Sequence, residues 1–150
     1  MENAMNKDIK RILIVLFTVL LLSCENVFKN DKLDFLWRLD SVEYLDGYDL
    51  FGKPCEKESK EGYWFSFARD LVEIENNNNS LFSAIGILTE NGNTLIFDFS
   101  MYNEESWSGI DYGLKIMGID SKVSTFTITE LNSKTLVLTG TKTILRFTKW

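Results

Sequence analysis

Hydrophobic and polar residues alternate with a period of two along most of the chain beyond residue 34, which is the pattern of half-buried β-strands. Clear examples are 63–67, 71–75 and 94–99. Asn91-Gly92, which stands between two such runs, is a strong β-hairpin signal. The last thirty residues repeat the pattern as a three-stranded meander. No stretch after residue 24 shows a convincing helical period, so the pattern predicts eight or nine short strands and no helix.

The first strand is predicted over Phe35–Leu45, with Trp37 and Leu39 on one face and Val42 on the other. A long loop, 47–62, follows it. The charge run inside this loop, 56–61, is interpreted as solvated loop or as one exposed helical turn.

A second long loop is predicted over Ser100–Gly113, followed by a further strand over Leu114–Ile119. The loop contains Tyr102, Trp107 and Tyr112 among acidic residues. Such a composition suits stacking on a sugar ring or holding a partner, and the alternative is that these aromatics fold back as a lid over one end of the domain.

Many short antiparallel strands joined by tight turns predict an all-β fold, an eight- or nine-stranded antiparallel up-and-down barrel, with a sandwich as the alternative. Whether the barrel closes is left open. Closing the sheet removes exposed edges. About eight strands leave an interior that side chains fill or that holds one small ligand. Phe65 and Phe97 are candidates for lining such a cavity, and a packed core is the alternative. The side chains expected to point inward are Trp37, Phe65, Phe67, Phe97, Phe99, Phe126 and Phe147.

The N-terminal segment has a different pattern. Three basic residues between positions 7 and 11 precede 12–22, in which only Thr18 is polar. A membrane-spanning helix needs about 20 apolar residues, so this run is predicted to be the hydrophobic region of a signal peptide. Met5 is an alternative start to the same signal.

Leu21-Leu22-Ser23-Cys24 resembles the lipobox of bacterial lipoproteins, in which the cysteine is lipidated on sulfur and becomes the first mature residue. The alternative is an ordinary secretory signal with an incidental cysteine. The resemblance implies a signal peptide over 1–23, a flexible tether over 24–33 and a domain over 34–150. It also implies acyl chains, palmitate among them, that anchor the protein in a bacterial cell envelope. The outer membrane is the expected location, with the periplasmic or surface face left open.

The amino-acid composition argues against several classes of function. The net charge is −6, and the mature chain would hold thirteen basic and twenty acidic residues, which argues against nucleic acid as a partner. The chain has no histidine, and lipidation of Cys24 would leave Cys55 as a single thiol. Neither a nucleophile elbow nor a glycine-rich phosphate loop is present. We therefore expect no catalytic residues, no metal site and no cofactor.

Together with the lipobox, three stretches carry a family resemblance: Leu36-Trp37-Arg38-Leu39, Tyr63-Trp64-Phe65, and the alternating C-terminal strands around Phe126, Leu136 and Phe147. The chain resembles small lipocalin-like lipoproteins of Gram-negative bacteria over nearly its whole mature length. It departs from the lipocalin pattern before Trp37, where Phe35-Leu36 stand in place of the usual glycine.

The resemblance implies a monomeric, non-catalytic domain that binds a small apolar or glycan ligand. Two alternatives are a protein-binding lipoprotein of inhibitor or immunity type that uses an acidic surface, and a structural component of the envelope.

Overall fold

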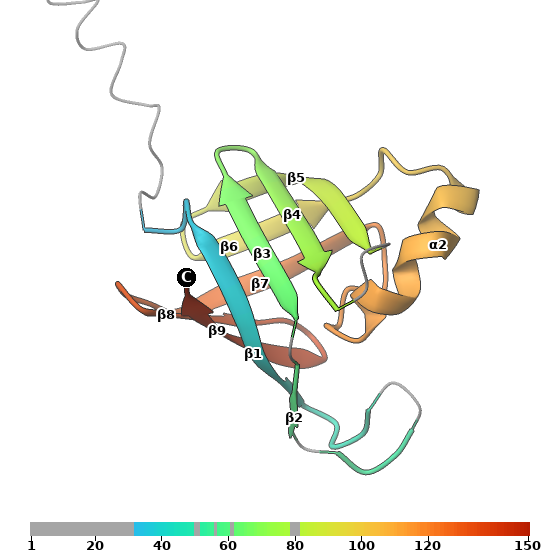
Figure 1. The fold of residues 1–150 in the computed structure, drawn as a ribbon, viewed down its shortest axis with the longest axis horizontal. Helices are drawn as coiled ribbons and strands as arrows, with labels where there is room; N and C mark the ends of the chain where they lie inside the picture. Colours follow the sequence, from blue (N-terminus) through green and yellow to red (C-terminus); the bar gives the residue numbers. More distant parts are fainter. Residues whose placement is uncertain (1–31, 50–51, 56, 61, 79–81) are drawn as a thin grey trace, which may run out of the picture.

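The computed structural model describes residues 32–49, 52–55, 57–60, 62–78 and 82–150, so the predicted signal peptide and lipobox lie outside the described residues. The described part folds into one antiparallel sheet and one helix (Figure 1). Its elements are β1 (Leu36–Tyr44), β2 (Lys57–Ser59), β3 (Tyr63–Ala68), β4 (Leu71–Asn76), β5 (Ser83–Asn91), β6 (Thr94–Asp98), α2 (Glu104–Lys115), β7 (Val123–Leu131), β8 (Thr135–Thr139) and β9 (Thr143–Lys149).

The sheet closes into a barrel. Each strand from β3 to β9 pairs with the next along the chain, and β9 pairs back with β1 from Trp37↔Lys149 to Tyr44↔Thr143. Strands β2 and β3 both pair with β1, β2 at residues 41–43 and β3 at residues 36–38. These two strands are therefore pieces of one barrel strand. The result is an eight-stranded, antiparallel, up-and-down barrel, which confirms the predicted fold class.

The connections of an up-and-down barrel alternate between its two ends. The short turns 68–71, 91–94 and 131–135 lie at the end where the chain enters β1, and we call this the turn end (Figure 1). The β1–β2 loop, the β8–β9 turn and α2 lie at the opposite end, which we call the helix end. The described chain, which starts at Lys32, thus enters the barrel at the turn end.

A β-bulge interrupts the alternation of β1. The pairing with β9 shifts between Leu39 and Ser41, so two residues of β1 oppose one residue of β9. Beyond the bulge Val42 and Tyr44 point into the core. The prediction that Val42 faces away from Trp37 and Leu39 is therefore wrong, because strict alternation does not survive an inserted residue.

Helix α2 replaces the predicted loop over Ser100–Gly113, and the predicted absence of helix is wrong. Asn103 caps the helix, because its side-chain oxygen accepts a hydrogen bond from the backbone N–H of Ser106 at 2.8 Å. Glu104 and Glu105 lie in the first turn, where they complement the helix dipole. At the other end, Lys115 pairs with Asp111 at 2.6 Å.

The prediction of a strand over Leu114–Ile119 is also wrong. Leu114 lies in the last turn of α2, and the chain then turns through Gly118, whose φ is 75°. Leu114, Met117 and Ile119 are all fully buried. In the first long loop, part of the charge run forms β2 instead of the expected loop or helical turn.

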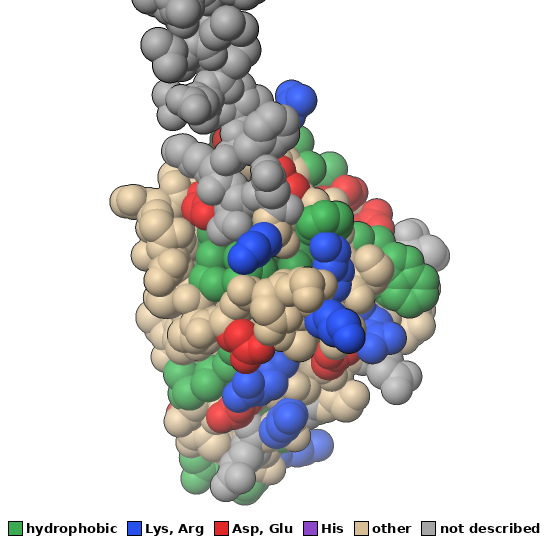
Figure 2. Space-filling model, turned by 90° about the vertical axis from the view of Figure 1, so that its left-hand side faces the viewer, with side chains coloured by type: hydrophobic (Ala, Val, Ile, Leu, Met, Phe, Trp, Pro, Cys, Tyr) green, Lys and Arg blue, Asp and Glu red, His purple; other side chains and the backbone are tan. Residues whose placement is uncertain are grey.

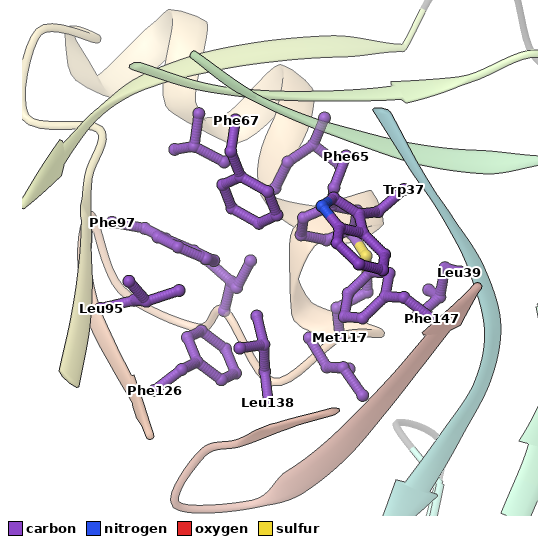
Figure 3. Close-up of a cluster of buried hydrophobic side chains, with 14 of the residues drawn as sticks. Trp37, Leu39, Phe65, Phe67, Leu95, Phe97, Met117, Phe126, Leu138 and Phe147 are labelled. Carbon is purple, nitrogen blue, oxygen red and sulfur yellow. The ribbon is translucent and has the colours of Figure 1, made fainter. Parts of the chain in front are cut away.

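Aromatic side chains fill the barrel (Figure 3). The ring of Phe97 lies 5.1 Å from that of Phe126 and 6.0 Å from that of Phe67, centroid to centroid. Phe65 contacts Phe147 edge to face at 4.8 Å. At the turn end the indole N–H of Trp37 donates to the carbonyl of Leu33 at 3.0 Å, and Leu33 is itself buried. The packed core therefore includes Leu33, which precedes the first strand.

Candidate functional site

The structure distributes the sequence-predicted site residues between the core and the helix end. Phe65 and Phe97 are fully buried, and their rings lie 6.5 Å apart within the packed aromatic cluster (Figure 3). Both side chains contact other rings on several sides, so they form the solid middle of the barrel.

Tyr102 and Trp107 pack against the barrel. The backbone N–H of Ile85 donates to the Tyr102 hydroxyl at 2.9 Å, which ties the start of the α2 region to β5. Trp107 is half-buried, with its ring 6.2 Å from that of Phe99. Tyr112, by contrast, is 56% exposed on α2. Two of the three loop aromatics thus contact the barrel, and the third is exposed on the helix.

Helix α2 and the turn that follows it cover the helix end. Gly113 lies so close to the ring of Phe82 that a Cβ there would come within 2.3 Å of it. The Thr143 hydroxyl donates to the carbonyl of Met117 at 2.8 Å, which joins the turn to β9. In Figure 3, Met117 points into the aromatic cluster and the helix lies behind the cluster. Side chains from this segment therefore fill the barrel mouth.

Beside this covered mouth lies a cavity of about 400 Å³. Three segments that are distant in sequence form it: the end of β1 with its following loop, the turn after α2, and the β8–β9 turn. The lining residues are Tyr44, Asp46, Tyr48, Asp49, Lys115, Gly118, Asp120, Lys142 and Thr143. The sequence prediction singled out none of them.

The cavity wall combines aromatic faces with carboxylates and ammonium groups. Tyr48 is 52% exposed, and its backbone N–H donates to the Asp46 carboxylate at 3.0 Å, which fixes the loop. Lys142 forms an ion pair with Asp120. The hydrogen bond and charge of Asp120, with a smaller contribution from Asp46, raise the pKa of Lys142, so it stays protonated at neutral pH. The cavity thus offers fixed donors and acceptors beside an aromatic ring.

Two observations on the described part of the chain concern metal-ligating and thiol side chains. No group of three or more His, Cys, Asp or Glu residues there is placed to hold a metal ion. Cys55 is a free, half-buried thiol. The helix that the structure describes is too short and too polar to cross a membrane.

Comparison with known proteins places the fold in a family. Residues 18–150 match the Lipocalin-like domain family, and the chain belongs to it. A lipocalin-like protein from Bacteroides uniformis superposes with a TM-score of 0.61 and 19% identity, over 79% of this chain and 99% of that one. An uncharacterized protein from Bacteroides eggerthii superposes with a TM-score of 0.59 and 17% identity, over the same shares of the two chains. No curated protein matches the sequence significantly.

Lipocalin-like barrels are in general binding folds, and an eight-stranded barrel has room for one small ligand or for side chains alone. In this chain, aromatic side chains occupy that interior. The open hollows of the described part lie outside this packed interior, and the helix-end cavity is one of them.

Proposed function

We propose that this protein is a lipid-anchored lipoprotein of the bacterial envelope whose barrel binds a small polar ligand of the glycan class, without catalysis. One contrast carries the proposal: aromatic rings pack the barrel interior, whereas the helix-end cavity is open and measures about 400 Å³. Small-molecule sites are usually about 300–1,000 Å³.

The lining chemistry supports a glycan in particular. A sugar ring presents an apolar face that stacks on an aromatic side chain, and its hydroxyl groups both donate and accept hydrogen bonds. Tyr48 offers the exposed ring, and the carboxylates of Asp46 and Asp49 offer acceptors. Lys142, which pairs with Asp120, offers a charged donor in the same cavity.

The protein-binding alternative requires an acidic surface. Carboxylates do gather at the helix end, but several of them are paired with lysines. Lys142 pairs with Asp120, Lys115 with Asp111, and Lys122 with Glu104 at 2.5 Å. Because this pairing neutralises much of the local negative charge, the helix end suits a small polar ligand better than a basic protein.

Membrane anchoring is supported by the lipobox-like stretch 21–24 and the signal-like segment before it. Acyl chains on Cys24 would hold the barrel at the membrane surface, because two or more chains give stable attachment where one does not. Native mass spectrometry of the membrane-extracted protein reports acyl mass and copurified ligand together. An unmodified Cys24 would contradict the anchor.

Tyr48→Ala tests the ligand site. We expect this change to weaken binding of glycans on an oligosaccharide array by about two- to tenfold, because a stacked aromatic contributes roughly 0.5–1.5 kcal/mol. Tyr112→Ala is the matched control, since Tyr112 is similarly exposed but lies outside the cavity. Equal losses in the two variants, or no glycan bound by the unmodified protein, would contradict the proposal.

A further inference from the structure

Basic and apolar side chains lie together at the turn end of the barrel. Figure 2 looks onto this side of the barrel and shows Lys and Arg side chains interspersed with Asp and Glu side chains, beside hydrophobic ones. Trp150 is 74% exposed, and Phe35 and Leu36 are each about two-fifths exposed. We call the following set the turn-end surface: Lys32, Phe35, Leu36, Lys134, Lys149 and Trp150.

Backbone and ring contacts fix this surface in place. The Lys149 ammonium lies 2.9 Å from the centre of the Phe35 ring. The Lys149 backbone N–H donates to the carbonyl of Lys134 at 2.8 Å, and that of Trp150 donates to the carbonyl of Leu36 at 3.0 Å. The Trp150 ring meets that of Trp64 edge to face at 4.9 Å. The exposed tryptophan is therefore held in one position.

The charged residues of the turn-end surface are all basic, whereas the net charge of the whole chain is −6. A hollow of about 380 Å³ lies between Lys32, Phe35 and Lys149, and the rest of its lining, from Leu131 to Ser133, carries no charge. In the described part of the chain, four acidic residues lie at the turn end: Asp34, Asp70, Glu90 and Glu130. Asp34 is exposed beside Phe35, and the Glu130 carboxylate accepts hydrogen bonds from the side chains of Asn132 and Thr135. The hollow itself is lined by cations and no anions.

We propose that the turn-end surface docks onto the anionic headgroups of the membrane to which Cys24 is anchored. The inference rests on the anchor in the proposed function. Seven residues lie between Cys24 and Lys32, and the eight Cα-to-Cα steps that join the two reach at most about 28 Å. Because the chain enters the barrel at the turn end, the anchor keeps this end within reach of the bilayer.

The side-chain chemistry matches that occupant. Tryptophan favours the level of the headgroups, where its ring is partly apolar and its N–H can donate. Lysines near the surface are attracted to anionic lipid and extend their ammonium groups to the phosphates. Docking in this way turns the helix-end cavity away from the membrane and towards the surrounding compartment, where a polar ligand would arrive.

Depth measurements on the full lipidated protein test the orientation. In a Cys55→Ser background, one nitroxide is attached through Ser133→Cys at the turn end and another through Thr141→Cys at the helix end; both native side chains are exposed. The vesicles contain phosphatidylethanolamine and phosphatidylglycerol. We expect the label at position 133 to collide several-fold less with a water-soluble nickel complex than the label at position 141, and more with oxygen.

Charge reversal separates docking from anchoring. Lys134→Glu with Lys149→Glu should return the label at position 133 to water while the protein stays on the vesicles. Lys53→Glu, an exposed lysine of the helix-end loop, should leave the label in place, and circular dichroism checks that each variant is folded. If both labels are equally exposed to water in the acylated, vesicle-bound protein, docking is excluded and the anchor stands. If Cys24 carries no acyl mass, the anchor itself fails.

Discussion

Phe97→Ala is expected to lower the free energy of unfolding by about 3–5 kcal/mol, the usual range for removing a buried phenylalanine. Phe97 is fully buried, and its ring contacts those of Phe65, Phe67 and Phe126. These neighbours come from two different strands of a closed barrel, β3 and β7, and cannot all move inward, so a cavity remains where the ring was.

Phe35→Ala is the matched control for this change. The Phe35 ring is 41% exposed and packs mainly against Lys149, so its loss should cost about 1 kcal/mol or less. Urea unfolding followed by tryptophan fluorescence measures both variants. If the two substitutions cost the same, the barrel interior is not the packed core described above.

Gly118→Ala should lower the free energy of unfolding by about 2–4 kcal/mol for two separate reasons. Gly118 has a φ of 75°, a conformation that costs an L-residue roughly 1–2 kcal/mol. An added Cβ would also lie 2.4 Å from the Thr143 hydroxyl oxygen. That hydroxyl donates to the Met117 carbonyl, and displacing it would break the link between β9 and the segment that covers the barrel mouth.

Gly47→Ala separates the two reasons. Gly47 has the same φ of 75°, but nothing lies within 4 Å of the position its Cβ would take. In Gly47→Ala, only the cost of the positive φ should lower the free energy of unfolding, by about 1 kcal/mol. The difference between the variants in thermal or urea unfolding then measures the contact with Thr143. Equal destabilisation would show that the helix-end turn is not closely packed on β9.

The strands were predictable from the sequence because their alternation is regular. Leu95, Phe97 and Phe99 are buried, whereas the residues between them are partly exposed, as a period of two requires. The hairpin turn after Asn91 also lies where expected, with Asn91 paired to Thr94. Closure of the barrel was not predictable in this way, because it depends on the pairing of β1 with β9, the two ends of the strand order.

Helix α2 escaped prediction because its apolar stripe is short. Trp107, Ile110 and Leu114 have helical spacing, but Gly109 and Gly113 lower the helix propensity of the segment. The signal that could have found it is the cap, an asparagine directly followed by two glutamates. Gly113 also has a packing reason, since it lets the helix approach Phe82.

The cavity was beyond prediction for a different reason. Asp46, Asp120 and Lys142 lie far apart in the sequence and belong to three connections, each of which reads as an ordinary polar turn. Only closure of the barrel brings these connections to one end. The bulge in β1 contributes as well, because it turns Val42 and Tyr44 towards the core beside this cavity.

Metabolic labelling is the most direct test of the central claim, which is that acyl chains on the sulfur atom of Cys24 anchor a lipocalin-like barrel to the membrane. The wild type, Cys24→Ala and Cys55→Ala are expressed in a bacterial host that is fed an alkyne-bearing fatty acid, and the purified chains are probed for the label. We predict label on the wild type and on Cys55→Ala, and none on Cys24→Ala. An unlabelled wild type, or a Cys24→Ala chain labelled as strongly as the wild type, would contradict the account.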